Sequence, residues 1–338
     1  MSRVMVMMSG GVDSSVAAAV LRDEGHDVTG VTLKLWGGES DSGCCSASDV
    51  EDARRVAAQL DIPHYVFNFT DAFDEHVVAP YVEAYASGET PNPCVECNRT
   101  MKFGRVLERA EQLGFDEVAT GHHARVVDTP DGPAIARGVD PAKDQSYVLY
   151  MLGTREIART RLPIGEMTKA EVRERAHALG LRTASKRESM DVCFITRGGR
   201  TAFLGNRVGR RPGVIVDTAG AEVGAHDGID NFTIGQRRGT GVAQGERRYV
   251  VDIAPASATV TIGPRDALLR DRIHLRDMTF AHTPPEAVTV QMRAHGRPFP
   301  ARLDGDTVLF DVPQTRVAPG QVVACYDGDV VLGGGIAC

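Results

Sequence analysis

The sequence predicts an α/β fold with a doubly wound parallel sheet, followed by one or two small β-barrel domains. Before residue 200, short apolar runs alternate with amphipathic helical segments, which is the pattern of parallel βαβ units. Beyond it, helical periodicity disappears and short β-branched runs separated by Gly, Pro and Asp take over. We therefore expect an α/β domain at 1–199, a central small β domain at 200–270 and a C-terminal β-barrel at 271–338.

The expected α/β domain begins with a buried strand at 4–8 that turns through glycine into an Ala-rich helix at 16–22. Ser48 with Glu51, and Thr168 with Glu171, have the spacing of capping boxes at the starts of two helices. Further strands are expected at 28–35, 65–69 and 117–120, helices at 72–85, 100–113 and 169–179, and loops at 37–47 and 88–98.

The second half of the chain contains the β-branched runs. They lie at 214–217, 249–253, 259–262, 288–292, 308–312 and 322–326. Residues 266–276 and the Pro-rich segment 283–286 are expected to be seams between β modules.

Composition points to an ordinary globular protein, with 42% hydrophobic and 25% charged residues among 338. We expect no signal peptide before the first strand, and no apolar run approaches the ~20 residues of a membrane span. Seven cysteines, an odd number in a chain without a secretory signal, predict functional thiols in a reducing cytoplasm. Because no segment could span a bilayer, we expect no membrane partner.

The net charge of −7 argues mildly against a large nucleic-acid surface. Five arginines nevertheless cluster between residues 197 and 211, in a stretch without any acidic residue. They are Arg197, Arg200, Arg207, Arg210 and Arg211. Such a local patch can bind a polyanion, but a solvated surface loop is an equally good interpretation.

The first strand runs into Ser9-Gly10-Gly11, which predicts a phosphate cradle. The glycines allow a tight turn, and the N–H groups of the following helix's first turn form an anion site. Asp13 is a candidate ligand for Mg²⁺. The residues of this stretch match neither the P-loop motif of NTPases nor the Gly-x-Gly-x-x-Gly motif of dinucleotide-binding folds. The alternative to a phosphate cradle is an ordinary βα turn. The stretch resembles the SGGxDS loop of the ATP-pyrophosphatase (PP-loop) superfamily, which implies adenylation of a substrate by ATP.

Cysteines and polar groups mark further candidate sites. Cys94 and Cys97 form a C-x-x-C pair between two prolines, a spacing that suits a shared metal, a disulfide or an activated thiolate. Cys193 stands among apolar residues, where core filling is the usual role. The adjacent His122 and His123 favour polar ligand contacts over a zinc site. Residues 143–147 suit phosphate and base edges, whereas Cys44, Cys45, Cys325 and Cys338 are interpreted as structural.

Taken together, these segments resemble the tRNA-specific 2-thiouridylase family over essentially the whole chain. The matching motifs are SGGVDSS at 9–15, NPCVECN at 92–98, ATGHHAR at 119–125, KDQSYVLY at 143–150, MDVCFI at 190–195, FTIGQRRG at 232–239, APGQ at 318–321 and LGGG at 332–335. The resemblance implies that ATP, with Mg²⁺, adenylates the 2-oxygen of the wobble uridine of a tRNA, and that sulfur then displaces AMP. It also implies a sulfur-donor partner, such as a cysteine desulfurase or a persulfide relay protein.

The resemblance also implies residue roles. Cys193 would carry the persulfide, and Cys97 would act as the nucleophile that releases product through a Cys97–Cys193 disulfide. The nucleotide would be bound by Met7, Met8, Ser9, Gly10, Gly11, Val12, Asp13, Ser14, Leu33 and Gly121. Positions that would contact tRNA are Asn92, Pro93 and Cys94 around the target base, and His122, Lys143, Asp144, Gln145, Arg293, Ala294 and Gln321 elsewhere.

One departure from the family pattern leaves the sulfur route open. Many members have aspartate where this chain has Cys94, so Cys94, Cys97 and Cys193 are an alternative ligand set for a [4Fe–4S] cluster that binds sulfide. Two rival functions also remain: another PP-loop ligase or amidotransferase acting on a small molecule, and a non-catalytic nucleotide-binding regulator.

Overall fold

The structure is a computed structural model that describes residues 1–36, 46–187, 192–195, 199–205, 207–209, 211–242, 245–294 and 296–338. Its N-terminal part is built on a five-stranded sheet in the order β3-β2-β1-β4-β7. Every pairing in this sheet is parallel. The strands are β1 (Arg3–Met7), β2 (Asp27–Lys34), β3 (His64–Asn68), β4 (Glu117–Ala119) and β7 (Thr160–Arg161). The predicted parallel sheet is confirmed.

Side chains of β1 alternate between two cores, which explains why helices cover both faces of the sheet. Val4 and Val6 face one core, together with the buried residues of α1 (Val12–Asp23), α2 (Ala47–Gln59) and α8 (Lys169–Ala178). Met5 and Met7 face the other core, where the helices between β3 and β4 pack. A strand buried on both sides reads as a continuous apolar run, as β1 does.

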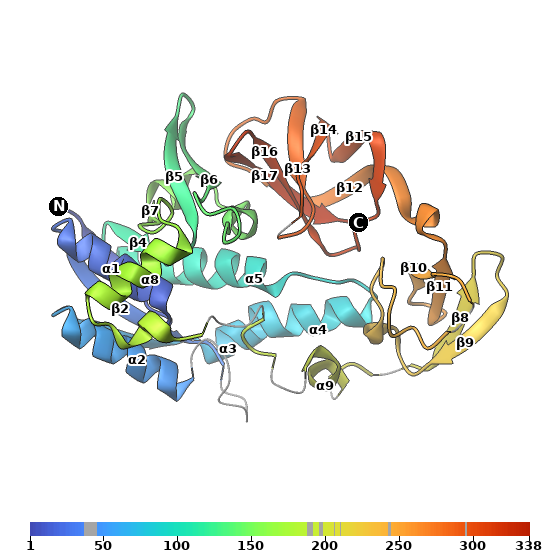
Figure 1. Cartoon of the computed structure of the whole chain (residues 1–338), viewed down its shortest axis with the longest axis horizontal. Coiled ribbons are helices and arrows are strands. Elements are labelled where there is room, and N and C mark those ends of the chain that lie inside the picture. Colours follow the sequence, from blue (N-terminus) through green and yellow to red (C-terminus); the bar gives the residue numbers. More distant parts are fainter. Residues whose placement is uncertain are drawn as a thin grey trace.

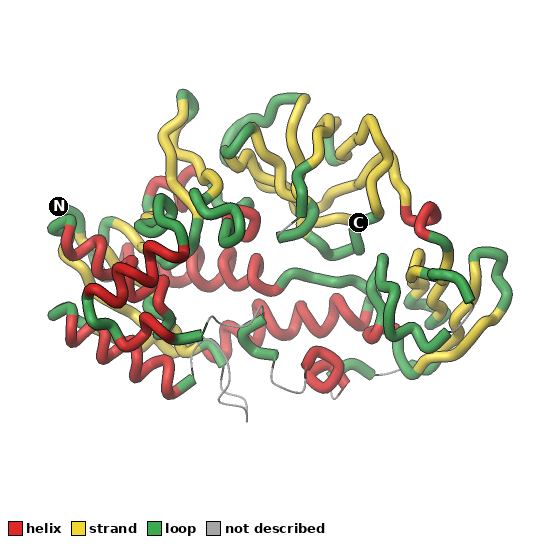
Figure 2. The backbone as a smooth tube through the Cα atoms, viewed as in Figure 1, coloured by secondary structure: helices red, strands yellow, loops and turns green. Residues whose placement is uncertain are grey.

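The helices between β3 and β4 form two long rods joined by residues 87–92 (Figures 1 and 2). The first rod consists of α3 (Thr70–Phe73), the π-helical η1 (Asp74–Val78) and α4 (Ala79–Ala86), and the second of α5 (Pro93–Glu96), the π-helical η2 (Cys97–Arg105) and α6 (Val106–Gln112). The predicted loop at 88–98 is therefore wrong in its second half. Pro93 lies in the first turn and the Asn92 side chain accepts from the Cys94 N–H, at 3.1 Å, so the helix begins before both cysteines.

The predicted capping box at Ser48 is also wrong by two residues. Ser46 is the N-cap of α2, and its side chain accepts from the backbone N–H of Asp49. Glu51 instead contacts Arg55, one turn further along the helix, at 2.9 Å. The box predicted at Thr168 and Glu171 is confirmed. Residues 37–45 of the loop predicted before α2, with Cys44 and Cys45, lie outside the described residues.

Several short elements between β4 and the β modules were not predicted. A hairpin of β5 (Ala124–Thr129) and β6 (Gly132–Arg137) follows β4 and reaches the C-terminal barrel, where Ala136 pairs with Val330. The others are η3 (Ser146–Leu149), α7 (Thr154–Ala158) and η4 (Arg182–Ser185). The hairpin therefore connects the α/β part to the barrel directly.

The second half of the chain forms two β modules, as expected from its texture. The first module follows α9 (Gly199–Gly205) and contains a four-stranded sheet. Its strands are β8 (Gly213–Asp217), β9 (Glu222–His226), β10 (Tyr249–Ala254) and β11 (Thr259–Gly263), and η5 (Ile229–Asn231) lies between β9 and β10 in the sequence. The second follows η6 (Arg265–Leu268) and contains β12 (Leu269–Phe280), β13 (Ala287–Gln291), β14 (Phe299–Asp304), β15 (Thr307–Thr315), β16 (Val322–Asp327) and β17 (Val330–Ala337).

The C-terminal module is a closed barrel, because β12 pairs with both β15 and β17. Residues 283–286 join β12 to β13 within it, so the seam predicted there is wrong. Leu268 belongs to the hydrophobic core of the first β module, and Ile273 belongs to the core of the barrel, so the chain passes from one core to the other between these residues. This change lies inside the seam predicted at 266–276.

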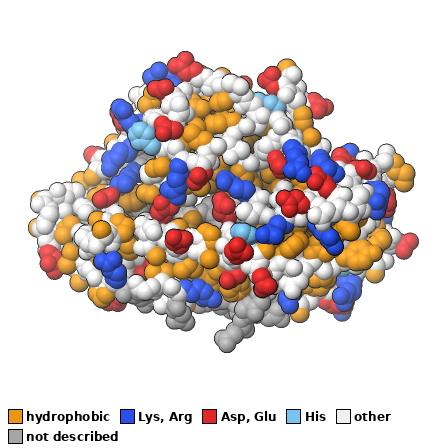
Figure 3. All heavy atoms as spheres, turned by 180° about the vertical axis from the view of Figure 1, so that it is seen from behind, with side chains coloured by type: hydrophobic (Ala, Val, Ile, Leu, Met, Phe, Trp, Pro, Cys, Tyr) orange, Lys and Arg blue, Asp and Glu red, His pale blue; other side chains and the backbone are white. Residues whose placement is uncertain are grey.

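The surface matches the moderate net charge. On the face opposite to the view of Figure 1, acidic and basic side chains are interspersed (Figure 3). Within the part of the chain that the structure describes, no helix has the length and apolar character needed to span a bilayer.

Candidate functional site

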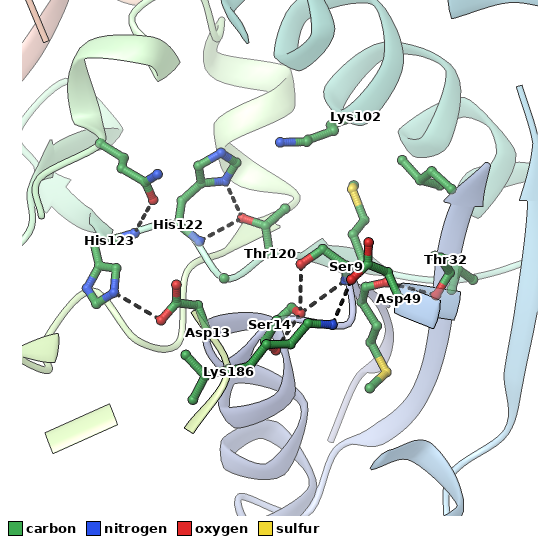
Figure 4. Close-up of a pocket in the computed structure, with 18 of the residues that line it drawn as sticks. Ser9, Asp13, Ser14, Thr32, Asp49, Lys102, Thr120, His122, His123 and Lys186 are labelled. Atoms are coloured by element: carbon green, nitrogen blue, oxygen red, sulfur yellow. Dashed lines mark hydrogen bonds and ion pairs between the residues drawn. The ribbon is translucent and has the colours of Figure 1, made fainter. Parts of the chain in front are cut away.

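A cavity of about 310 Å³ opens at the carboxyl ends of β1 and β4. The chain leaves β1 toward β2 on one side, and β4 lies on the other, so the cavity is at the switch point of the sheet where ligands bind in such folds. The predicted nucleotide residues that line it are Met7, Met8, Ser9, Gly11, Val12, Asp13, Ser14, Leu33 and Gly121. The structure thus brings nearly all of them together (Figure 4).

Gly10 is the predicted nucleotide residue that does not line the cavity; it supports the turn from behind. Its φ is +71°, a conformation that favours glycine, and a Cβ there would collide with the carbonyl oxygen of Asp49. Ser14 Oγ accepts from the Ser9 N–H at 3.1 Å and so fixes the turn across its mouth. The N-cap of α1 is Gly11, which has no side-chain cap, so the first turn of the helix keeps N–H groups that can bind an anion.

Gly121 presses the end of β4 against this turn. A Cβ on Gly121 would lie 2.6 Å from Ser14 N and 2.7 Å from the carbonyl carbon of Asp13. Real Cβ atoms do not approach backbone atoms so closely, and neither backbone can move without disturbing the cradle. The close approach explains why glycine is needed at this position.

Lys169, which the sequence reading did not single out, supplies a cation to the cavity. Its Nζ lies 2.7 and 2.8 Å from the two carboxylate oxygens of Asp13, and His123 Nε2 lies 3.3 Å from one of them. Burial alone would raise the pKa of Asp13, but the hydrogen bonds of His123 and Lys169 outweigh it and the pKa is lowered. Asp13 is therefore an anion at neutral pH, as a Mg²⁺ ligand has to be.

Lys186, also missed, ties the cradle to the helix α2. Its Nζ donates to the Gly10 carbonyl at 2.9 Å, to Asp49 Oδ1 at 2.6 Å and to Asp52 Oδ2 at 2.7 Å. Burial would lower the pKa of Lys186, but the two carboxylates raise it overall. Lys102, Lys143 and Arg187 line the same cavity, so the site is strongly basic, as polyphosphate binding requires.

We expect Lys186→Met to raise the KM for ATP about tenfold, because two carboxylates and the Gly10 carbonyl lose a charged donor. Steady-state kinetics at saturating second substrate measures this. Arg54→Met is the matched control. Arg54 is an exposed cation of α2, the helix that Lys186 contacts, and it does not line the cavity. An unchanged KM in Lys186→Met would show that the tie does not shape the cradle.

The two adjacent histidines have different partners. His122 is buried and its Nδ1 is hydrogen-bonded to Thr120 Oγ1 at 2.7 Å. Burial, followed by the positive charge of Lys102, lowers the pKa of His122 well below its usual range, so its ring is neutral. His123 turns instead to Asp13, while its backbone N–H donates to Gln145 Oε1 at 3.0 Å. Both rings thus make polar contacts within the protein beside the cavity, and their predicted contact with a ligand stays a prediction.

The segment of Lys143, Asp144 and Gln145 is fixed against the end of β4, and Lys143 and Gln145 line the cavity. The Gln145 N–H donates to the His123 carbonyl at 2.9 Å. Asp144 is buried, and its carboxylate accepts from Arg137, from the Gly138 N–H and from both the N–H and Oγ of Ser146. The Asp144 side chain therefore holds the loop in shape.

Arg137 extends this network to the barrel. Its Nη1 also donates to Gln291 Oε1 at 2.8 Å, and its guanidinium stacks 3.9 Å above the Tyr326 ring. The Gln291 amide donates in turn to the carbonyls of Arg293 and Ala294, at 3.0 and 2.9 Å. The two segments predicted to contact tRNA, 143–145 and 293–294, are thereby joined through Arg137 and Gln291.

The three candidate cysteines lie around the two helical rods, which pack on the face of the sheet that carries Met5 and Met7. Cys97 is buried at the start of η2, and Cys94 and Cys193 are half-buried. Phe194 is fully buried, and its ring packs 5.3 Å from that of Tyr81 and 5.7 Å from that of Phe73. Phe194 therefore fills the core, while Cys193 stands at the edge of the apolar cluster that contains Cys97.

The residues do not fit a metal cluster. All three thiols belong to the described part of the chain, and there no three His, Cys, Asp or Glu side chains are grouped as metal ligands. We therefore derive no step of the chemistry through iron.

Of the arginine patch, Arg200, Arg207 and Arg211 are described, and Arg197 and Arg210 lie outside the described residues. Arg200 donates to the Tyr85 hydroxyl at 3.2 Å, and Arg207 stacks 4.2 Å above the Phe203 ring. Arg211 donates to the Ala256 carbonyl at 3.0 Å. These three side chains have structural contacts, which favours the plainer of the two interpretations for them.

Comparison with known families covers the whole chain. Residues 2–197 match the family described as the tRNA methyl transferase HUP domain, residues 201–264 the tRNA methyl transferase PRC-barrel domain, and residues 270–337 the aminomethyltransferase beta-barrel domain. Among solved structures, a 4-thiouridine synthetase in complex with RNA and ATP is 18% identical, with a TM-score of 0.38 over 57% of this chain and 44% of that one. That similarity is too distant to support an argument.

Full-length relatives are much closer. A protein named tRNA-specific 2-thiouridylase MnmA from Roseiflexus sp. (strain RS-1) is 48% identical, and the match covers 99% of both chains. The protein of the same name from Frankia casuarinae is also 48% identical, over 98% of both chains. With this identity over the full length, the chain belongs to the tRNA-specific 2-thiouridylase family.

Proposed function

We propose that this protein uses ATP to replace the 2-oxygen of the wobble uridine of a tRNA with sulfur. The observation that carries the proposal is the helix η2, which joins the two halves of the chemistry. Cys97 is its first residue, and Lys102, one turn and a half further on, lines the nucleotide cavity. One rigid element thus connects a thiol to the place where ATP would bind.

In the first step, the uracil 2-oxygen attacks the α-phosphorus of ATP. A new P–O bond forms, the bond between the α- and β-phosphates breaks, and pyrophosphate leaves. The N–H groups at the start of α1, with the cationic Lys169 and Lys186 nearby, hold the phosphates, and Asp13 is the candidate to bind Mg²⁺. Leu33 and Gly121, which line the cavity, would border the nucleotide.

In the second step, the terminal sulfur of a Cys193 persulfide attacks the uracil C2, and AMP leaves. Cys97 then attacks Cys193 Sγ, which breaks the sulfur–sulfur bond to the uridine and releases 2-thiouridine. The two thiols are oxidised to a disulfide while the transferred sulfur is reduced. An external dithiol regenerates the pair, and a persulfide-carrying sulfur donor reloads Cys193. Asn92, Pro93 and Cys94 would flank the target base.

Thiolation fits the residues better than the alternatives. Methyl transfer, which the printed family descriptions mention, needs neither a pyrophosphate cradle nor paired thiols. A PP-loop ligase for a small molecule would not need tRNA, and a nucleotide-binding regulator would not turn ATP over. The experiment is to incubate the protein with ATP, unmodified tRNA and a persulfide donor, and to measure pyrophosphate and 2-thiouridine. Pyrophosphate release that requires tRNA, with 2-thiouridine formed, supports the proposal, and release without tRNA contradicts it.

The role of Cys94 separates the persulfide route from a cluster. We expect Cys94→Ala, purified anaerobically, to keep thiolation within about threefold of the unaltered protein, because a persulfide on Cys193 needs only Cys97 as partner. Iron content and 2-thiouridine yield are measured on the same preparations. A brown protein with about four iron atoms per chain, whose activity disappears in Cys94→Ala, would overturn the persulfide route.

A further inference from the structure

Residues 87–92 lead into the thiol-bearing helix, and the barrel holds two of them, Glu89 and Thr90. Arg276 of β12 makes a two-pronged ion pair with Glu89, with Nη1–Oε1 at 2.9 Å and Nη2–Oε2 at 2.7 Å. The Thr90 N–H donates to the Pro319 carbonyl at 2.8 Å, and Gln321 Nε2 donates to the Thr90 carbonyl. The barrel thus holds Glu89 through its side chain and Thr90 through its backbone N–H and carbonyl.

Close packing reinforces these bonds. Gly320 has a φ of +86°, and a Cβ there would lie 3.1 Å from both Glu89 Cβ and Thr90 N. On the other side, a Cβ on Gly88 would lie 3.0 Å from Pro255 and 3.2 Å from Ile253, which belong to the central β module. Residues 88–90 are therefore enclosed between both β modules.

The segment after Thr90 is stiff enough to transmit its position. Pro91 and Pro93 fix two backbone φ angles, and Asn92 accepts from the Cys94 N–H at 3.1 Å to begin α5. Cys94 and Cys97 follow within seven residues of Thr90. A displacement of Glu89 and Thr90 would therefore move the start of the helix that carries both thiols.

We propose that Arg276 and Gln321 are positioning residues for sulfur transfer, and that the C-terminal barrel sets the place of the thiol helix through Glu89 and Thr90. The proposal rests on the proposed function. It assigns Gln321, a position predicted to contact tRNA, a contact within the protein. It also predicts which half-reaction depends on the barrel. The cradle itself is built from β1, α1 and β4, which the ion pair does not contact, so we expect loss of the ion pair to impair sulfur transfer more than adenylation.

The test uses Glu89→Gln, Arg276→Met and the exchanged pair Glu89→Arg with Arg276→Glu, all in the full chain. Two products are measured under single-turnover conditions: pyrophosphate released in the presence of tRNA, and 2-thiouridine. We expect each single variant to lower the 2-thiouridine formed per pyrophosphate by at least about tenfold, since small misplacements of reacting groups have effects of this size. Pyrophosphate release should fall by a smaller factor than 2-thiouridine formation, and the exchanged pair should recover at least half of the ratio.

Arg302→Met is the matched control, because Arg302 is an exposed barrel arginine that pairs with a glutamate, Glu286, away from residues 87–92. Its ratio should not change. An unchanged ratio in the single variants would overturn the proposal. A second outcome would also overturn it: both products fall equally in the single variants, their melting temperature is lower, and the exchanged pair restores neither. Failure of the proposed function is distinguishable, because the unaltered protein would then form no 2-thiouridine.

Discussion

Replacing Cys97 or Cys193 with serine is expected to lower 2-thiouridine formation at least about 100-fold while tRNA-dependent pyrophosphate release continues. A serine hydroxyl cannot carry a persulfide and cannot displace one, so the second step has no chemical substitute. The first step uses the cradle, to which neither side chain contributes. Mass spectrometry of digested tRNA and a pyrophosphate assay give the two quantities from one reaction.

Cys338→Ser is the control for this pair, because Cys338 is an exposed cysteine at the end of the chain, outside both thiol segments. Its yield should equal that of the unaltered protein. If either serine variant still formed a tenth of the normal 2-thiouridine, the sulfur would have to travel by another residue.

Gly121→Ala should abolish the first step, with a fall of at least about 100-fold in kcat/KM for ATP. The added methyl group would lie 2.6 Å from Ser14 N and 2.7 Å from the carbonyl carbon of Asp13, so the cradle or the end of β4 must shift. The misplaced N–H groups could then no longer meet the phosphates. Binding of ATP by calorimetry and tRNA-dependent pyrophosphate release together measure the effect.

Gly209→Ala is the matched glycine control. A Cβ there meets no atom within 4 Å, and the substitution should leave ATP binding and turnover unchanged. Normal ATP affinity in Gly121→Ala would show that β4 does not bear on the cradle, and the site would have to be rebuilt around other contacts.

The part of the site that local sequence determines was predictable. The strand, the glycine turn and the first helical turn around Gly10 and Asp13 are neighbours in the chain, and each needs a recognisable residue type. The parallel sheet followed from strands and helices that alternate at regular spacing. The roles of the thiols came from resemblance, because residue pattern alone made Cys193 a core residue.

What the sequence did not reveal depends on contacts between distant segments. Lys169 and Lys186 reach the cradle from more than 150 residues away, and nothing around either position signals a ligand. The contact of Arg137 with Gln291 and that of Arg276 with Glu89 likewise exist only because the barrel packs against the α/β part. Local errors had local causes. Ser46, with Asp49 three residues later, caps α2 in place of Ser48. Asn92 and Pro93 begin a helix where the two prolines had predicted a loop.

The central claim is that Cys97 and Cys193 act on the same sulfur atom. The most direct measurement is a single turnover with ATP, tRNA and persulfide-loaded protein, quenched with a thiol-blocking reagent and digested for peptide mass spectrometry. We predict one Cys97–Cys193 disulfide for each 2-thiouridine formed, appearing at the same rate. Formation of 2-thiouridine with both thiols recovered unpaired would contradict the account.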